Sequence, residues 1–275
     1  EPSHGADEPI VEYSFSTSNL DNAVDESRAI TTLISDAFNL EDRIYYRLKL
    51  CIYELAVNSV EHGIFKSIPP LISCAVSRHD DQLRVCYKDN AEGYPENAFQ
   101  DVHIEDKIKS KSKRGLGLFI MNRLAEDLRF ERVGKENKTT FTIKGISSHP
   151  ITKQGRITMD SFSIKLETCD IEDAKIVKPI GSIDSITTRN LEDQLLSLMD
   201  KRTKYIIVDF SEVNFISSAG IGVLLGTVSS LREDNGDLVF MKVPSQVKEI
   251  FDILNISDYF INVDNINELK ETIKA

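Results

Sequence analysis

The chain has 275 residues, of which 41% are hydrophobic and 28% charged, a composition of globular proteins at a length that favours two domains. No apolar run is long enough to span a bilayer, and the start EPSHGADEP lacks the basic and apolar regions of a secretory signal. A net charge of -11 argues against direct nucleic-acid binding, because phosphate backbones carry the same sign.

The first half predicts helices packed on one sheet. Two amphipathic helices are expected over residues 25–38 and 41–62, where apolar residues recur at helical spacing. Two strands, 71–77 and 82–88, follow as a hairpin. A polar loop over 89–114 then leads into a helix that begins near Gly115, and strands at 128–133 and 140–144 complete this half. This order of elements predicts an α+β two-layer sandwich.

The second half alternates strands with helical patterns, which predicts an α/β domain. The expected strands are 163–167, 174–180, 205–209, 238–242 and 259–263. A polar stretch before them, rich in Ser, Pro and Gly, is typical of a linker. We therefore expect a tail at residues 1–11, a first domain at 12–145, a linker at 146–161 and a second domain at 162–275.

The cysteines indicate the compartment. Cys51, Cys74, Cys86 and Cys169 show no CxxC spacing and lie in apolar segments. Such thiols are typical of a reducing environment, so we expect a cytoplasmic protein without a disulfide or zinc site.

A carboxylate and a carboxamide lie one turn apart on the second predicted helix. Glu54 and Asn58 are four residues apart, so their side chains project from one face. Together they could accept a proton and hold a water or Mg²⁺. The pair is a weak signal alone, because both residue types are common on solvated helix faces.

Glycine-rich and basic segments strengthen this signal. The run from Asp89 to Gly93 follows a predicted strand, and a basic loop ending at Arg114 precedes Gly115 and Gly117 at a helix start. Backbone N–H groups at such a start can approach phosphate oxygens, and the helix dipole favours negative charge. The pattern is neither a Walker P-loop nor a Rossmann motif, so it predicts a different kind of anion site.

In this order the segments ELAVNSVEHG, DNAEGY and RGLGLFIMNRLAEDL resemble the N, G1 and G2 boxes of the GHKL, or Bergerat, ATP-binding fold. The resemblance covers roughly residues 12–145, and within this fold the segments resemble specifically the anti-sigma-factor serine kinases. It implies ATP and Mg²⁺ as cofactors, Glu54 as general base, Asn58 as Mg²⁺ ligand and Asp89 as reader of the adenine amino group. The other residues that it implies for the nucleotide site are Gly93, Arg114, Gly115, Leu116, Gly117, and Thr139 or Thr140. Ala91 departs from the glycine usual in the family, which would tighten that turn.

Two serines at the start of a later helix suggest a phosphorylation site. Ser217 and Ser218 follow a buried strand; either could be a helix N-cap, or a place where phosphate changes partner binding. The surrounding sequence resembles the STAS domain of anti-sigma-factor antagonists over about residues 162–275, which implies a mixed sheet with surrounding helices. It further implies Ser218 as phosphoacceptor, with Ser217 as the alternative, and Asp184 near the site. Ser217 stands where the family often has Asp, and Ala219 where it often has Ser or Thr.

The two resemblances together predict a bacterial partner-switching regulator. An ATP-dependent protein serine kinase domain would phosphorylate a STAS serine, in its own chain or a partner's, and control a sigma factor or similar target. The implied partners are a sigma factor, a STAS or anti-sigma protein, and a PP2C-type phosphatase, without membrane insertion or direct nucleic-acid contact; a homodimer is compatible. The alternatives are a non-catalytic, ATP-gated binding module with STAS as docking platform and, more weakly, a histidine-kinase core.

Overall fold

The computed structural model describes residues 10–65, 69–92, 115–146 and 162–274, which belong to two compact units. The first unit is built on a five-stranded sheet and the second on a six-stranded sheet. Within these residues, no helix combines the length and the apolar character needed to cross a membrane.

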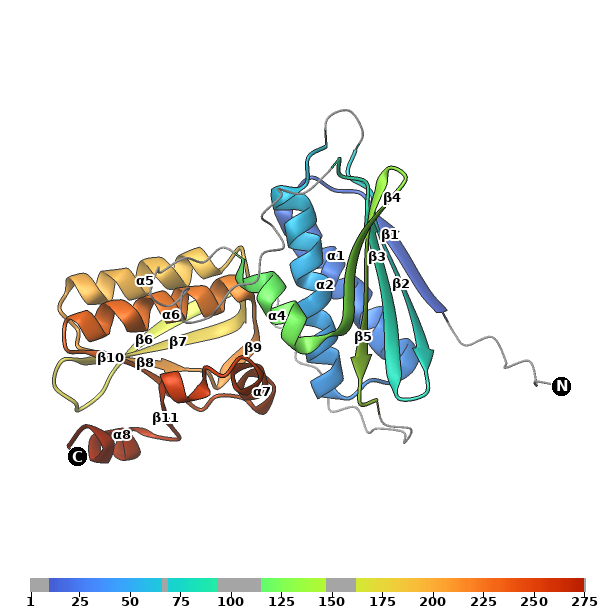
Figure 1. Ribbon diagram of the computed structural model, residues 1–275. Helices are drawn as coiled ribbons and strands as arrows, with labels where there is room; N and C mark the ends of the chain where they lie inside the picture. Colours follow the sequence, from blue (N-terminus) through green and yellow to red (C-terminus); the bar gives the residue numbers. More distant parts are fainter. Residues whose placement is uncertain (1–9, 66–68, 93–114, 147–161, 275) are drawn as a thin grey trace. The chain divides into compact units, whose positions relative to one another are not determined.

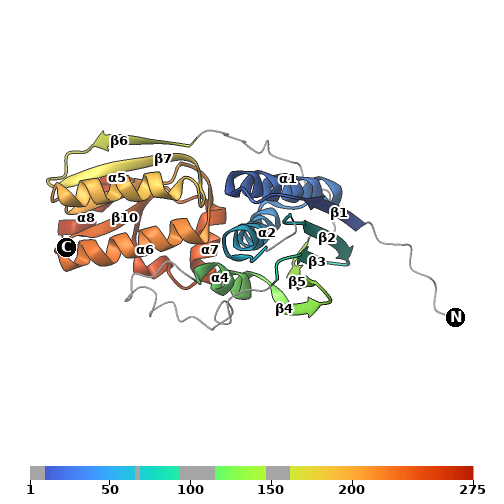
Figure 2. The same ribbon diagram turned by 90° about the horizontal axis from the view of Figure 1, so that it is seen from above.

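The sheet of the first unit is antiparallel throughout, with the strand order β1-β2-β3-β5-β4. Its strands are β1 (Ile10–Phe15), β2 (Ile72–His79), β3 (Gln82–Asp89), β4 (Glu126–Val133) and β5 (Glu136–Lys144). The helices α1 (Leu20–Phe38), α2 (Asp42–His62) and α4 (Leu116–Leu124) lie on one face of this sheet (Figures 1 and 2). This arrangement confirms the predicted α+β sandwich.

The helices are held on the sheet by the apolar stripes that the sequence displays. α1 buries Ile30, Ile34 and Phe38, and twelve of the residues of α2 are buried. On β3 the buried side chains alternate, so that Leu83, Val85, Tyr87 and Asp89 share the helix-facing side. The core therefore lies between α1, α2 and the inner face of the sheet.

The first unit departs from the sequence prediction at its start. β1 begins at Ile10, inside the predicted tail, and pairs with β2 from Ile10 opposite Ser77 to Phe15 opposite Ile72. Only Phe15 of this edge strand is buried, so its hydrophobic signal is weak. α1 begins at Leu20, because the side chain of Asn19 caps it by accepting a hydrogen bond from the Asn22 N–H.

The second unit has a mixed sheet with the order β11-β10-β8-β7-β6, and β9 also pairs with β7. β6 and β7 are antiparallel, whereas the other pairs are parallel. The strands are β6 (Ser163–Thr168), β7 (Ala174–Ile183), β8 (Tyr205–Asp209), β9 (Glu212–Ile216), β10 (Asp237–Met241) and β11 (Ile261–Val263). The helices are α5 (Thr188–Asp200), α6 (Ser218–Glu233), α7 (Ser245–Ile253) and α8 (Ile266–Lys274).

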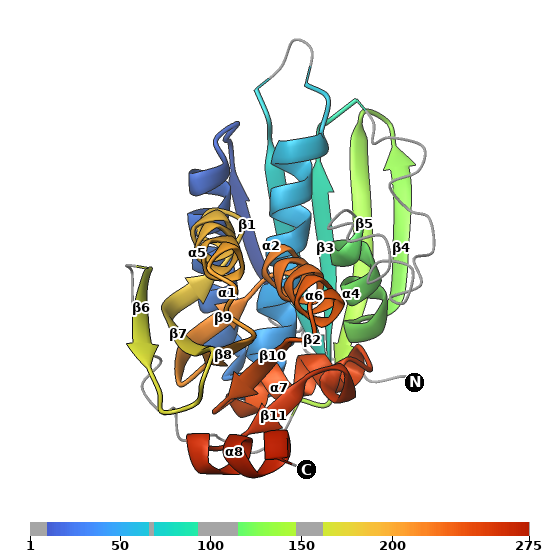
Figure 3. The ribbon, with the colours of Figure 1, turned by 90° about the vertical axis from the view of Figure 1, so that its left-hand side faces the viewer.

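Helices cover both faces of this sheet, as predicted for an α/β domain. In Figures 1 and 3, α5 and α6 lie on one face and α8 on the other. α8 packs through Leu269 against buried strand residues that include Ile207 and Val239. The last strand is shorter than predicted, because residues Ser257–Tyr259 form a 3-10 turn before it.

Candidate functional site

Helix α2 carries the carboxylate and the carboxamide that the sequence places one turn apart. Glu54 is 3% exposed and Asn58 is half-buried, one turn further along. The helix ends at His62 and is followed by Gly63, where an added Cβ would lie 2.2 Å from the carbonyl oxygen of Ser59. Gly63 is therefore required by close approach of the backbone, since its φ of −67° is open to any residue.

Asp89 lies at the end of β3, where α2, β3 and β5 meet. Its side chain is buried, and Oδ2 accepts a hydrogen bond of 3.1 Å from the hydroxyl of Ser59, the neighbour of Asn58. Oδ1 accepts from the Ala91 N–H at 3.0 Å and from Nδ2 of Asn137 at 2.7 Å. These contacts stabilise a buried carboxylate, which would otherwise be costly to desolvate. They also place Asp89 beside the helix that carries Glu54 and Asn58.

The loop after Asp89 is tied to the segment that follows α2. The side chain of Asn90 accepts from the Leu71 N–H at 2.7 Å and donates to the Pro69 carbonyl at 3.0 Å. The N–H of Glu92 donates to the carbonyl of Ile64 at 2.8 Å. Ala91 is fully buried and does not adopt a positive φ, so this turn accommodates the methyl group that departs from the family pattern.

The glycine before α4 has a backbone conformation that favours glycine. Gly115 has a φ of 79°, in the left-handed region, and the helix begins at Leu116 with Gly117 in its first turn. N–H groups of this first turn have no partner within the helix and can face an anion. Gly93, Arg114 and the basic loop before Arg114 lie outside the described residues.

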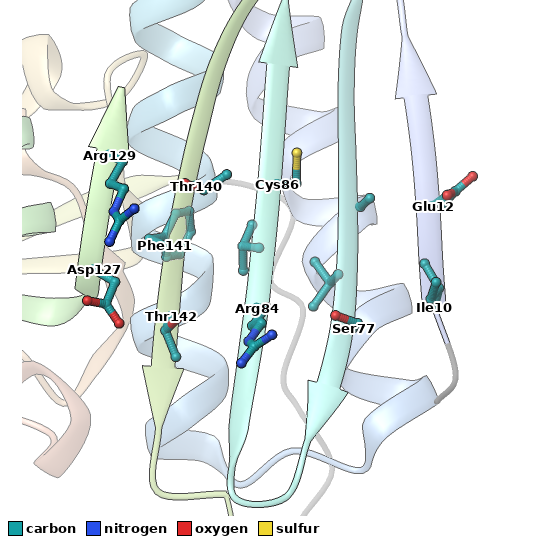
Figure 4. A pocket seen from close by; sticks show the side chains of 13 residues that line it. Ile10, Glu12, Ser77, Arg84, Cys86, Asp127, Arg129, Thr140, Phe141 and Thr142 are labelled. Carbon is teal, nitrogen blue, oxygen red and sulfur yellow. The ribbon is translucent and has the colours of Figure 1, made fainter. Parts of the chain in front are cut away.

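The two threonines proposed near adenine lie on opposite faces of β5. Thr139 is buried and pairs with Tyr87, so it shares the face of Asp89. Thr140 pairs with Cys86 on the outer face, where it lines a shallow hollow of about 530 Å³ with Arg84 and Arg129 (Figure 4). Of the two, Thr139 is the residue on the side of the candidate nucleotide site.

The chemistry of these residues fits an adenine nucleotide. A buried carboxylate offers an acceptor for an amino group, and the start of α4 offers backbone donors for phosphate. Within the described ranges, no group of three or more His, Cys, Asp and Glu side chains gathers in a way that could hold a metal ion. A single side-chain ligand such as the amide oxygen of Asn58 would suit Mg²⁺, because this ion usually takes its other ligands from phosphates and water.

The two serines at the start of α6 differ in exposure. Ser217 is fully buried and caps the helix, with its hydroxyl accepting from the Gly220 N–H at 3.3 Å. Ser218 is the first residue of the helix and is partly exposed. The sequence allowed either serine to be the N-cap of this helix, and in the structure Ser217 is the N-cap.

Asp184 holds the turn that precedes α5. Its Oδ1 accepts from the N–H groups of Ile186 and Thr187, both at 3.0 Å, and from the Thr187 hydroxyl at 3.1 Å. The carbonyl of the preceding residue, Ile183, accepts from the Ser217 N–H at 2.8 Å. The backbone next to Asp184 is therefore hydrogen-bonded to Ser217. The carboxylate of Asp184 itself stabilises the turn before α5.

Three residues near these sites were not predicted from the sequence: Ser59, Asn137 and Gly220. Ser59 could have been found, because it follows Asn58 in the same motif and a small hydroxyl there can reach a neighbouring strand. Asn137 carries no local signal, since it meets Asp89 only through the pairing of β3 with β5.

Comparison with known proteins matches both halves of the chain. Residues 17–143 match the sequence model of the histidine kinase-like ATPase domain, and residues 165–274 match that of the STAS domain. An anti-sigma-B factor antagonist of Staphylococcus epidermidis is 27% identical over 97 residues, which are 35% of this chain and 90% of that protein.

Two further proteins are similar to part of this chain. BtrV of Bordetella bronchiseptica, named as an anti-sigma factor antagonist, is 31% identical over 80 residues, covering 29% of this chain and 69% of its own. The crystal structure of an anti-sigma factor antagonist from Mycobacterium paratuberculosis is 19% identical, covers 42% of this chain and 97% of that one, and has a TM-score of 0.38.

Proposed function

We propose that this chain, which belongs to the histidine kinase-like ATPase and STAS families, is a partner-switching regulator whose first domain phosphorylates a STAS serine. The observation that supports this proposal most is the hydrogen bond between Asp89 and helix α2. A buried carboxylate suited to an amino group is hydrogen-bonded to Ser59, on the helix that carries Glu54 and Asn58. Recognition of adenine at the end of β3 and phosphoryl transfer at α2 would therefore be linked by this hydrogen bond.

The residues of α2 suit phosphoryl transfer to a hydroxyl. Glu54 would accept the proton of the serine hydroxyl. At the same time the serine oxygen would bond to the γ-phosphorus of ATP, and ADP would leave. Asn58 would supply an oxygen ligand to Mg²⁺, which neutralises phosphate charge when bound. The N–H groups at the start of α4 would hold phosphate oxygens in place.

Ser218 is the proposed phosphoacceptor. We prefer it to Ser217 because Ser218 is partly exposed, whereas Ser217 is buried. Its phosphate would add nearly two negative charges beside the N-terminus of α6, where the helix dipole stabilises them. A partner that docks on this end of the STAS domain would then be released or recruited. In this scheme the partners are a sigma factor or an anti-sigma protein, and a PP2C-type phosphatase resets the serine.

Labelled ATP tests the proposal directly. With Mg²⁺, the parent protein should gain acid-stable label on a serine, and Glu54→Gln should slow labelling at least about 100-fold, because the general base is lost. Ser218→Ala should remove label from this STAS domain. Ser217→Ala is the matched control: it should remain a substrate while losing about 1 kcal/mol of stability with its cap.

Three results would count against the proposal. Absence of label on this chain and on any STAS protein would favour an ATP-gated binding module. Acid-labile label would indicate a histidine kinase, and label that survives Ser218→Ala but not Ser217→Ala would move the acceptor. Mixing Glu54→Gln with Ser218→Ala separates the two routes of transfer, because only transfer between chains can label the Glu54→Gln protein.

A further inference from the structure

Besides its contact with α2, Asp89 is held by a pair of residues in the β4–β5 hairpin. Asn137 donates from Nδ2 to Oδ1 of Asp89 at 2.7 Å and to the carbonyl of Ala91 at 3.1 Å. Arg132, which pairs with Asn137 across the hairpin, donates to Oδ1 of Asn137 at 2.7 Å and also to the Ala91 carbonyl. Neither residue lies in the segments that resemble the nucleotide-binding motifs.

We infer that Arg132 and Asn137 are positioning residues that set the selectivity of the site for adenine by fixing the orientation of the Asp89 carboxylate. The inference rests on the proposed binding of ATP. Arg132 fixes which way the Asn137 amide points, because its guanidinium can only donate and so requires the amide oxygen. The amide nitrogen of Asn137 is thereby directed at Asp89.

The orientation of the carboxylate matters because a carboxylate alone does not distinguish adenine from guanine. A carboxylate accepts hydrogen bonds only, so it can accept from the 6-amino group of adenine. Turned or shifted, it could accept instead from the N1–H and 2-amino donors of guanine. With Oδ1 held by Asn137 and the Ala91 N–H, and Oδ2 contacted by Ser59, the carboxylate is restrained in one rotamer.

The test is calorimetric titration of the full chain with ADP and with GDP, each with Mg²⁺, so that no phosphoryl transfer intervenes. Asn137→Ala should weaken ADP binding about tenfold with little change for GDP, because one hydrogen bond to a charged group is lost. Arg132→Ala should lower the ADP-over-GDP ratio in the same direction, by about threefold. Lys138→Ala is the control, since Lys138 lies next to Asn137 but forms an exposed ion pair with Glu131 at 3.6 Å.

The ratio of the two affinities distinguishes positioning from a loss of structure, which would weaken both nucleotides alike. Thermal unfolding without nucleotide verifies that each variant is folded; should Asn137→Ala fail to fold, Arg132→Ala decides alone, because its side chain is exposed. A ratio that stays at the control value in the folded variants overturns the inference and leaves the proposed kinase intact. A parent protein that binds neither nucleotide overturns both.

Discussion

Burial separates the cysteines of the chain into two classes. Cys51 and Cys74 are fully buried, whereas Cys86 and Cys169 are half-buried. Burial raises the pKa of both buried thiols, that of Cys74 to about 12, and the negative charge of Glu54 raises the pKa of Cys51 further. Because the thiolate is the reactive form, these two thiols should be inert in the folded protein.

A thiol titration at pH 8 tests this difference. Ellman's reagent should modify Cys86 and Cys169 in the folded protein, and Cys51 and Cys74 only after a denaturant is added, when their raised pKa values return to normal. Reaction of all four thiols at one rate without denaturant would contradict the buried positions.

At the scale of secondary structure, α6 shows why one glycine is required and another is not. Gly220 faces the ends of β7 and β9, and an added Cβ would lie 2.7 Å from Cγ2 of Ile183 and 2.9 Å from Cγ1 of Ile216. Gly226, in the same helix, has no atom within 4 Å of such a Cβ. The first glycine allows the helix start, with its serines, to approach the strands closely.

The matched pair Gly220→Ala and Gly226→Ala tests this packing by urea unfolding. Gly220→Ala should lower the free energy of unfolding by about 1–3 kcal/mol, because the methyl group overpacks the contact with Ile183. Gly226→Ala should raise it by about 0.5–1 kcal/mol, since alanine has the better helix propensity and room is available. Equal effects of the two changes would contradict the assignment.

The elements that the sequence predicted and those that it missed differ in physical character. The helices around Leu48 and Leu224 and the buried strand over 205–209 display strong periodic or continuous apolar patterns, and all were predicted. β1 was missed because five of its six residues are not buried. The strand predicted over 259–263 began two residues before β11. Residues 257–259 form a 3-10 turn instead, which no hydrophobic periodicity indicates.

At the scale of the whole molecule, the division into two units predicts two stability responses. ADP with Mg²⁺ at 100 times its dissociation constant should stabilise the unit that carries Asp89 by about 2.7 kcal/mol, because a ligand stabilises only the part that binds it. Differential scanning calorimetry should then show one unfolding transition rising and the other unchanged. A common shift of both transitions would indicate that the units unfold together, and no shift would argue against the nucleotide site.

The sequence by itself determined the two fold classes, the family resemblances and the position of Glu54 and Asn58 one turn apart on one helix. These features could be predicted because helical spacing, strand alternation and short motifs each depend on residues that are close together in the sequence. Only the tertiary structure decided that Thr139 rather than Thr140 shares the face of Asp89 and that Ser217 rather than Ser218 is buried. It alone joined Asp89 to Asn137, 48 residues apart, because strand register and burial depend on which distant segments pair.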